Sequence, residues 1–160
     1  MSRQGDHIVT TTKTDKVRIK VWSAMTGQEL LAIDEQRELL NLVALSPDGA
    51  EILVIGKADE TATTYDSRTG QLRRTFKLAS TPCHATYSPS GDCVVFIDTY
   101  GNVDIYGAKS GTFIGKVEGC SGDSNHVKAL PLPGSQTLLI RDDDNRHLHL
   151  YNIQDLLRIR

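Results

Sequence analysis

Short runs of alternating polar and apolar residues recur along the whole chain, and turn residues bound each run. The clearest runs end at an aromatic residue, as residues 18–22 do at Trp22 and residues 102–106 do at Tyr106. Alternation with a period of two is the pattern of a β-strand whose two faces meet different surroundings. Residues 61–65 follow it least well, because Thr64 replaces an apolar residue, but their threonines still favour a strand. The pattern predicts an all-β chain.

The aromatic residues that end these strands repeat with a period of about 42 residues. They are Trp22, Tyr65, Tyr106 and Tyr151. Two kinds of turn keep the same period. A Thr-Gly or Ser-Gly pair follows each of the first three aromatics, and a Pro/Gly turn separates the repeats at residues 46–49, 88–91 and 132–135. Independent markers that share one period indicate a repeat architecture.

Each repeat contains several short strand candidates that are joined by hairpin-compatible turns. The predicted strands are 7–12, 18–22, 40–45, 51–56, 62–65, 71–77, 83–87, 93–97, 102–106, 112–117, 127–132, 137–141, 147–151 and 156–160, with a further outer strand in the first repeat. Consecutive strands joined in this way form an antiparallel meander. One such sheet cannot bury both of its faces alone, and radial stacking of four-stranded sheets at this period is a β-propeller.

The order of these elements resembles the WD-repeat family. In that pattern an apolar strand leads into a Ser-Pro-Asp-Gly turn, here residues 46–49, and a later strand ends at an aromatic followed by Thr-Gly, here residues 69–70. The resemblance covers residues 7–160 and implies antiparallel blades of a WD-type β-propeller. The expected blades lie at about 7–34, 39–77, 83–118 and 126–160, with three, four, four and four strands. This is a single partial propeller, an incomplete ring of about 3.75 blades.

The repeats depart from the family pattern at two places. The Gly-His pair of the family is absent, and Glu35-Gln36 and Phe76-Lys77 stand in its place. The turn aspartate six residues before the aromatic is present only as Asp59. We therefore expect the hydrogen-bonded Asp–His–Ser/Thr–Trp network of the family to be missing, and apolar packing to hold the sheets together.

Composition and charge narrow the classes of partner. The net charge is −2 and no run of five like charges occurs, which argues against a nucleic-acid or membrane-surface footprint. The longest apolar stretch, residues 39–45, is too short to span a bilayer, and the first fifteen residues lack the apolar core of a secretory signal. Three cysteines without framework spacing suit a reducing compartment. We expect a cytoplasmic or nuclear protein.

Candidate catalytic and metal-binding residues are few. His147 and His149 share one face of a strand close to residues 142–144, but both occupy repeat columns that are always polar. Cys83 and His84 are adjacent, so on a strand their side chains point to opposite faces. The chain has neither a phosphate-binding glycine loop nor a nucleophile elbow. We expect no catalytic residue, no metal site and no cofactor.

The function predicted from the resemblance is a non-catalytic scaffold for protein–protein interaction. Propeller loops converge on a rim, and the loops between second and third strands, with those leading into each blade, are charged or polar here. A rim with more acidic than basic residues suits a protein partner or a basic peptide. Self-association or further blades would complete the ring. The candidate partner-binding residues are Glu35, Arg37, Lys57, Asp59, Asp98, Tyr100, Asp142 and Asp143.

An enzymatic or cofactor-binding propeller is the alternative. Residues 81–91 also resemble the YVTN-type repeat, and residues 66–70 resemble a quinoprotein repeat. A site along the ring axis would need matching polar ligands from several blades. The inner-strand candidates Asn41, His84 and Lys128 are chemically mismatched, which argues against such a site.

Overall fold

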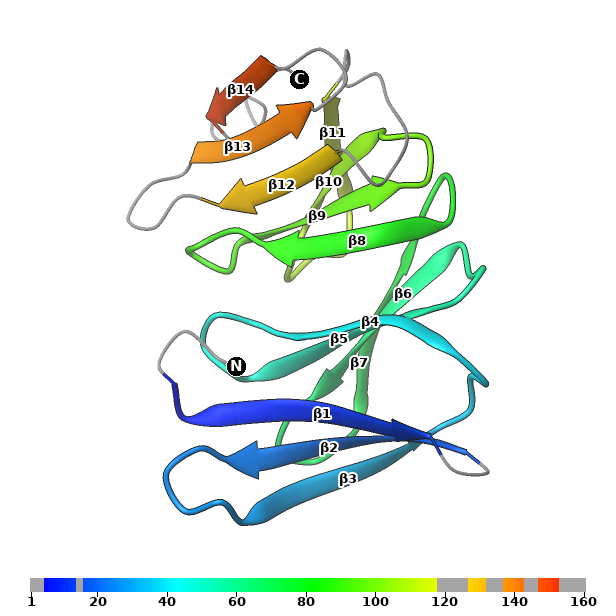
Figure 1. Cartoon of the computed structure of the whole chain (residues 1–160), viewed down its shortest axis with the longest axis vertical. Helices are drawn as coiled ribbons and strands as arrows, with labels where there is room; N and C mark the ends of the chain where they lie inside the picture. Colours follow the sequence, from blue (N-terminus) through cyan, green and yellow to red (C-terminus); the bar gives the residue numbers. More distant parts are fainter. Residues whose placement is uncertain (1–4, 14–15, 118–126, 132–136, 143–146, 153–160) are drawn as a thin grey trace. The chain divides into compact units, whose positions relative to one another are not determined.

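Every regular element that the structure describes is a β-strand. The computed structural model describes residues 5–13, 16–117, 127–131, 137–142 and 147–152 (Figure 1). All strand pairs in these ranges are antiparallel, and each sheet follows the order of the chain. The all-β, antiparallel fold class predicted from the sequence is confirmed. Because no helix occurs in these ranges, none could cross a membrane.

The chain divides into two compact units, and the first comprises residues 1–79. It holds a first sheet of order β1-β2-β3 and a second sheet of order β4-β5-β6-β7. The strands are β1 (His7–Lys13), β2 (Val17–Ser23), β3 (Glu29–Glu35), β4 (Leu40–Leu45), β5 (Glu51–Gly56), β6 (Thr61–Asp66) and β7 (Leu72–Lys77). The bounds of β4 and β5 are those predicted from the sequence.

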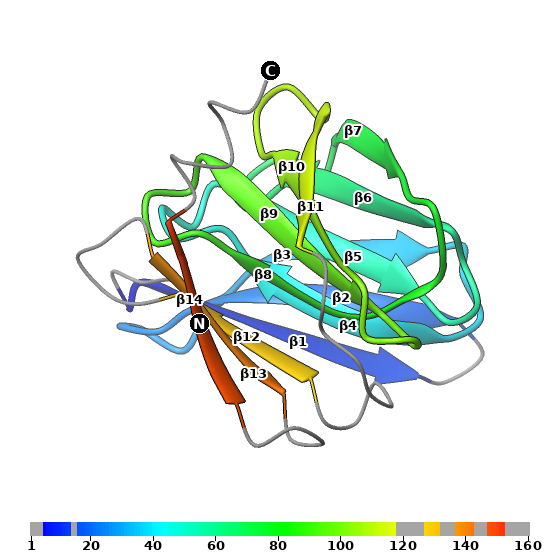
Figure 2. The same ribbon diagram turned by 90° about the horizontal axis from the view of Figure 1, so that it is seen from above.

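The second unit comprises residues 80–160. Its third sheet has the order β8-β9-β10-β11, and its fourth sheet has the order β12-β13-β14 (Figure 2). The strands are β8 (Pro82–Tyr87), β9 (Cys93–Asp98), β10 (Val103–Gly107), β11 (Phe113–Val117), β12 (Val127–Pro131), β13 (Thr137–Asp142) and β14 (His147–Asn152). The strand predicted at 156–160 lies outside the described residues. That all four repeats form one domain stays a prediction.

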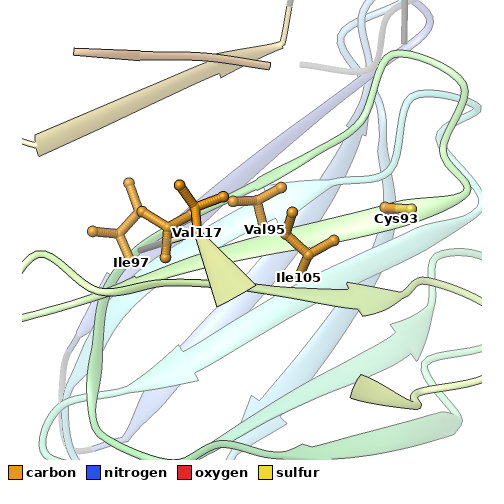
Figure 3. Packing of buried hydrophobic residues seen from close by; sticks show 6 residues of the cluster. Cys93, Val95, Ile97, Ile105 and Val117 are labelled. Carbon is orange, nitrogen blue, oxygen red and sulfur yellow. The ribbon is translucent and has the colours of Figure 1, made fainter. Parts of the chain in front are cut away.

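Each unit has an apolar core built from alternate residues of its strands. In the first unit Ile19 and Val21 of β2 pack with Ile52 and Val54 of β5, all fully buried. In the second unit Val95, Ile97 and Ile105 belong to one buried cluster (Figure 3). Tyr151 of β14 packs against this cluster. Burial of each such aliphatic side chain contributes about 1.5–3 kcal/mol. Because apolar residues alternate along each strand, one face of each sheet is apolar. The next sheet of the same unit covers that face.

The repeat is visible in an irregularity of the backbone as well. In each of the first three sheets the pairing between the last two strands, β2–β3, β6–β7 and β10–β11, shifts by one residue immediately before the aromatic. The shifts fall between Val21 and Trp22, between Thr64 and Tyr65, and between Ile105 and Tyr106. A β-bulge of this kind increases local twist. Three bulges at one repeat position confirm the repeat architecture.

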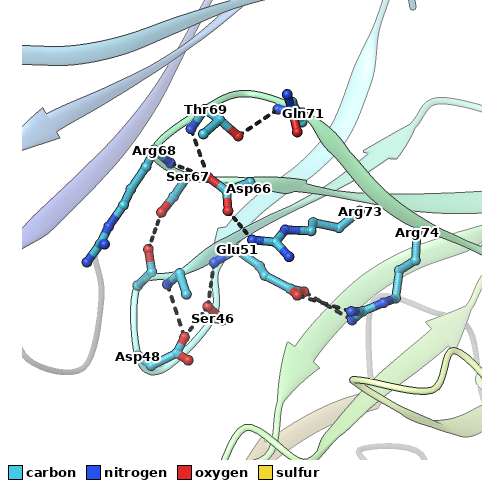
Figure 4. A network of polar contacts seen from close by, with 12 residues as sticks. Ser46, Asp48, Glu51, Asp66, Ser67, Arg68, Thr69, Gln71, Arg73 and Arg74 are labelled. Atoms are coloured by element: carbon cyan, nitrogen blue, oxygen red, sulfur yellow. Dashed lines mark hydrogen bonds and ion pairs between the residues drawn. The ribbon is translucent and has the colours of Figure 1, made fainter.

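A network of polar contacts ties together the turns at one end of the second sheet (Figure 4). The Asp66 carboxylate accepts the backbone N–H groups of Arg68 and Thr69 at 2.9 and 2.8 Å, and it also pairs with the Arg73 guanidinium. The Ser67 hydroxyl donates to the Gly49 carbonyl at 2.6 Å, which joins the β6–β7 turn to the β4–β5 turn. Asp66, which directly follows the aromatic Tyr65, therefore organises this end of the sheet.

We predict that Asp66 makes stability pH-dependent. The Arg73 guanidinium and the turn amides hold the pKa of the Asp66 carboxyl well below its usual range. A lowered folded-state pKa gives stability that is present above the unfolded pKa, about 3.9, and is lost as the pH falls below it. The difference in unfolding free energy between the wild type and Asp66→Asn, measured in urea, should therefore be largest near pH 7 and shrink toward pH 2.

Asp104→Asn provides a control of opposite sign. Burial raises the pKa of the Asp104 carboxyl, so its contribution to stability is present at low pH and falls as the pH rises. The Asp66 assignment is wrong if the two variants show the same trend with pH.

We predict that Thr64→Val stabilises the chain by about 1 kcal/mol. Thr64 is fully buried, and its hydroxyl has no hydrogen-bond partner among the described residues. The same repeat column holds Val21 and Ile105, both fully buried. Valine keeps the shape and removes the unsatisfied hydroxyl, whereas Thr64→Ala would also leave a cavity and lower stability. A lower melting temperature for Thr64→Val would show that the hydroxyl is satisfied in solution.

Candidate functional site

Two loops meet at the opposite end of the second sheet and form the candidate site. One is the β3–β4 connection at residues 36–39, and the other is the β5–β6 turn at residues 57–60. The Lys57 N–H donates to the Leu39 carbonyl at 3.0 Å and joins the two loops. An open pocket of ≈ 360 Å³ lies between them. It is lined by Arg37, Glu38, Leu39, Lys57, Ala58 and Asp59.

Arg37 is the centre of a hydrogen-bonded network beside this pocket. Its Nε donates to Asp59 Oδ2 at 2.7 Å, and its Nη1 donates to Glu35 Oε2 and Thr63 Oγ1, each at 3.1 Å. Burial alone would lower the pKa of the guanidinium. The hydrogen bond to Asp59 and the charge of Glu35 outweigh burial and raise that pKa above its usual value. Arg37 is therefore a fixed cation that holds both loops against β6.

Glu35 is the buried counterpart of Arg37. It is 4% exposed, and its Oε1 also accepts the backbone N–H of Gln36 at 2.9 Å. Tyr65 donates its hydroxyl to Glu35 Oε2 at 3.1 Å. Burial, followed by the charge of Glu35, raises the pKa of the Tyr65 hydroxyl, which keeps it protonated as a donor. Several donors thus compensate the buried carboxylate.

The network fits only because residue 56 is a glycine. A Cβ atom at Gly56 would lie 2.6 Å from Cδ of Arg37 and would overlap the Asp59 carboxylate. The neighbouring Ala58 has a φ of 64°, which is unusual for a residue with a side chain. A strained residue and a required glycine in one turn indicate that this turn is built to place particular side chains.

The sequence analysis considered only the Asp–His–Ser/Thr–Trp network of the WD-repeat family and did not anticipate the different network found in the second sheet. Asp59 and Thr63 are joined there, but Arg37 takes the central place expected for histidine, and Tyr65 stands in the aromatic position with Glu35 as its acceptor. A search for the family's Gly-His pair could not find Arg37. Arg37 lies at another position of the β3–β4 loop than the expected histidine, and its longer side chain places the guanidinium between Asp59 and Thr63. The network is charged, whereas the expected one would centre on histidine.

The third sheet carries a second rigid turn between β9 and β10. The Asp98 carboxylate is 6% exposed and accepts the N–H groups of Tyr100 and Asn102, each at 2.8 Å, and the Ser80 hydroxyl at 2.6 Å. Burial would raise the pKa of Asp98, but these hydrogen bonds lower it below its usual value. Gly101 completes the turn with a φ of 82°. The result is a turn that displays Tyr100, 75% exposed, to solvent.

The structure gives the predicted residues different roles. Glu35, Arg37 and Asp59 contact one another, and Lys57 lies on the same pocket with its side chain exposed. Asp98 supports the turn that carries Tyr100. Asp142 ends β13 and pairs with His147 in the backbone ladder, and Asp143 lies outside the described residues.

Sequence reasoning missed several contributors to the site. Thr63 and Tyr65 were treated only as strand residues, and Glu38 and Leu39 had no motif to mark them. One feature of the sequence could have pointed to this site, namely a glycine, Gly56, three residues before Asp59. No group of three or more His, Cys, Asp or Glu side chains in the described ranges is placed to hold a metal ion.

Comparison with known proteins assigns the fold. No family model matches the sequence, and no curated protein matches it. In structure the chain is similar to the beta-propeller domain of Cps50 (Swd1) from Myceliophteria thermophila, with a TM-score of 0.71 and 16% identity. The match covers 92% of this chain and 50% of that chain, so the chain spans about half the length of its neighbour. The similarity shows that the sheets are those of a β-propeller.

We predict that Arg37→Ala destabilises the chain by about 3 kcal/mol, because it leaves the Glu35 carboxylate buried without its cation. Arg18→Ala is the matched control. Its ion pair with Asp34 is half exposed on both sides, so its loss should cost far less than the loss of Arg37. Urea unfolding measures both values. Adding Glu35→Gln to Arg37→Ala should recover part of the loss, and equal effects of the two arginine substitutions would contradict the buried-pair assignment.

Proposed function

We propose that this chain is part of a WD-type β-propeller and acts as a non-catalytic platform for a protein partner. The observation that carries the proposal is the Arg37 network, which fixes two loops around an open pocket. Rigid loops that present variable side chains are typical of binding surfaces. The bulges at one repeat position and the order of the turns support the WD-type assignment.

The residues of the first unit fall into a supporting set and a contacting set. Glu35, Arg37 and Asp59 are committed to one another and hold the loops. Glu38, Lys57 and Glu60 are exposed and lie on or next to the pocket. The two loops at residues 36–39 and 57–60, together with Glu35 at the end of β3, hold four carboxylates, Glu35, Glu38, Asp59 and Glu60, against the two cations Arg37 and Lys57. The excess negative charge favours a basic segment of a partner.

In the second unit, Tyr100 is the proposed contact residue. An exposed tyrosine on a rigid turn offers a large amphipathic surface with little conformational entropy to lose on binding. Asp98 supports Tyr100 and does not itself need to touch the partner. This division of roles refines the sequence-based prediction, in which both residues were partner-binding candidates.

No observation in the described residues favours the alternative of an enzymatic or cofactor-binding propeller. Asn41 of β4 and His84 of β8 are exposed but differ in chemistry. We therefore keep the scaffold function. On its cysteine content we propose a cytoplasmic or nuclear location.

We predict that binding follows the charge of the pocket. A partner recovered from a lysate by crosslinking would be purified and titrated against variants by calorimetry. Glu38→Lys combined with Glu60→Lys should weaken binding by about tenfold or more, since two repulsive charges replace two attractive ones. Lys57→Glu should leave affinity equal or higher. Arg68→Glu, an exposed charge reversal at the other end of the second sheet, should have no effect.

Tyr100→Ala tests the second contact, with Met25→Ala, at an 88% exposed position, as its control. Unchanged affinity in both Glu38→Lys/Glu60→Lys and Tyr100→Ala would overturn the proposed surface. A stoichiometric metal or chromophore in the purified protein would favour the enzymatic alternative.

A further inference from the structure

The candidate pocket has an apolar patch on its wall. Leu39 and Ala58 line it, and the Leu39 side chain is 43% exposed. The backbone around both residues is held by hydrogen bonds. The Leu39 carbonyl accepts the Lys57 N–H at 3.0 Å, and at the other end of the β5–β6 turn the Glu60 carbonyl accepts the Leu78 N–H at 3.0 Å. An exposed leucine on a fixed backbone can pack against an aliphatic group without the cost of ordering the loop first.

The charged groups around the pocket differ in whether they already have a partner. Arg37 is compensated by Glu35 and Asp59, with N–O distances of 3.1 and 2.7 Å. Glu38 and Lys57 are exposed, and neither forms an ion pair with any residue that the structure describes. The carboxylate of Glu38 is therefore a charge on the pocket wall that a ligand can pair with.

The sign of the charge around the pocket favours a cationic ligand. The lining residues together with Glu35 carry three carboxylates, Glu35, Glu38 and Asp59, against the two cations Arg37 and Lys57. A bound cation reduces this excess of negative charge, whereas a bound anion increases it. Lys57 opposes a bound cation, but its long side chain is exposed and can turn into solvent.

The size of the pocket suits a single side chain. A volume of ≈ 360 Å³ lies at the lower end of ligand pockets, which span about 300–1,000 Å³. Lysine and arginine combine an aliphatic stem with a cationic end, and they bury the stem on apolar surface while the charge stays in water. The pocket offers both surfaces, Leu39 and Ala58 for the stem and Glu38 for the charge. A purely apolar side chain would leave Glu38 without a partner.

We propose that this pocket binds the side chain of one lysine or arginine in the partner's basic segment. The proposal rests on the proposed platform function, which calls for a basic segment but not for a particular contact. The stem of the bound residue packs against Leu39 and Ala58, and its cationic end pairs with Glu38 near the partly exposed Asp59. Acetylation of a bound lysine, which removes its charge, weakens the contact.

Blocked amino acids test the proposal with the full chain and without any partner. Nα-acetyl-lysine amide would be titrated into the isotope-labelled protein and followed by NMR. A ligand of this size binds with a Kd of about 1 mM where it fits well. The largest shifts should occur at the backbone amides of Leu39, Lys57 and Ala58. Nα-acetyl-arginine amide should shift the same amides, and the tighter of the two ligands identifies the preferred residue.

Three related ligands provide matched controls and leave the protein unaltered. Nα-acetyl-norleucine amide keeps the stem but lacks the charge, and Nε-acetylation of the lysine ligand removes the charge by modification. Each should bind about threefold more weakly or worse, which is the contribution of one exposed ion pair. The amide of Nα-acetyl-diaminopropionic acid keeps the charge on a much shorter stem. It should lose about tenfold, since it covers less of the apolar patch.

Substitutions in the protein test the same two contacts. Glu38→Gln should remove most of the preference for lysine over norleucine, because it removes the carboxylate that pairs with the charge. Asp92→Asn is the matched control, since it removes the same charge from an exposed position in the second unit and should leave the preference unchanged. Leu39→Ser should weaken both ligands alike. Lys57→Gln should strengthen lysine binding, because it removes the opposing charge.

Three results would overturn the proposal. The first is the absence of shifts at the pocket amides up to about 10 mM lysine ligand, tenfold above the expected Kd. The second is equal affinity for the lysine and norleucine ligands, which would make the pocket merely apolar. The third is tighter binding of Nα-acetyl-glutamate amide, which would assign the pocket to an anion held by Arg37 and Lys57.

Failure of the pocket and failure of the platform function give different results. If the lysine ligand does not bind while Glu38→Lys combined with Glu60→Lys still weakens the purified partner, only the side-chain pocket is wrong. If the lysine ligand binds while that double variant leaves the partner's affinity unchanged, the pocket stands and the platform surface is wrong.

Discussion

The fold depends on covering one apolar face of a β-sheet with another sheet. A strand that alternates polar and apolar residues buries only one face in its own sheet, so Ile19 and Val21 need the facing side chains of Ile52 and Val54. This requirement is non-directional and tolerates any aliphatic residue of suitable size. It explains how the chain forms propeller sheets although its short motifs differ from one repeat to the next. Apolar packing sets the arrangement, and polar residues then fix the ends of each sheet.

Polar networks at the two ends of the second sheet have different consequences. At one end, Asp66 secures the turns through backbone amides and an exposed arginine. At the other end, the Glu35–Arg37 pair is largely buried, and each member needs the other because an unpaired buried charge is costly. Coupled residues of this kind keep loops in one conformation. The pocket next to Arg37 therefore has defined walls before any partner arrives.

Much of the fold could be predicted from the sequence, because alternating polar and apolar residues indicate strands, and proline and glycine indicate turns. The bulge before each aromatic could not, since the extra residue lies in the partner strand and leaves no mark on the alternating run itself. The site was predicted less completely. Arg37 and Asp59 were named from their loops, but the hydrogen bond from Arg37 to Thr63 joins residues 26 positions apart. Asp98 and Tyr100 were both named because they lie in the same polar loop. Their place in the loop could not show that Asp98 is buried and supports the turn while Tyr100 is exposed.

The edge strands of these sheets differ in how many charged side chains they carry. The outer edge of the second sheet, β7, carries exposed Arg73 and Lys77, and the outer edge of the first, β3, carries exposed Glu29 and Asp34. Charges at such positions discourage pairing with another chain. The inner edge at β1 has threonines instead, whose shape suits a strand between two neighbours. Charged side chains therefore protect the β3 and β7 edges, whereas the only charge on β1 is Lys13 at its end.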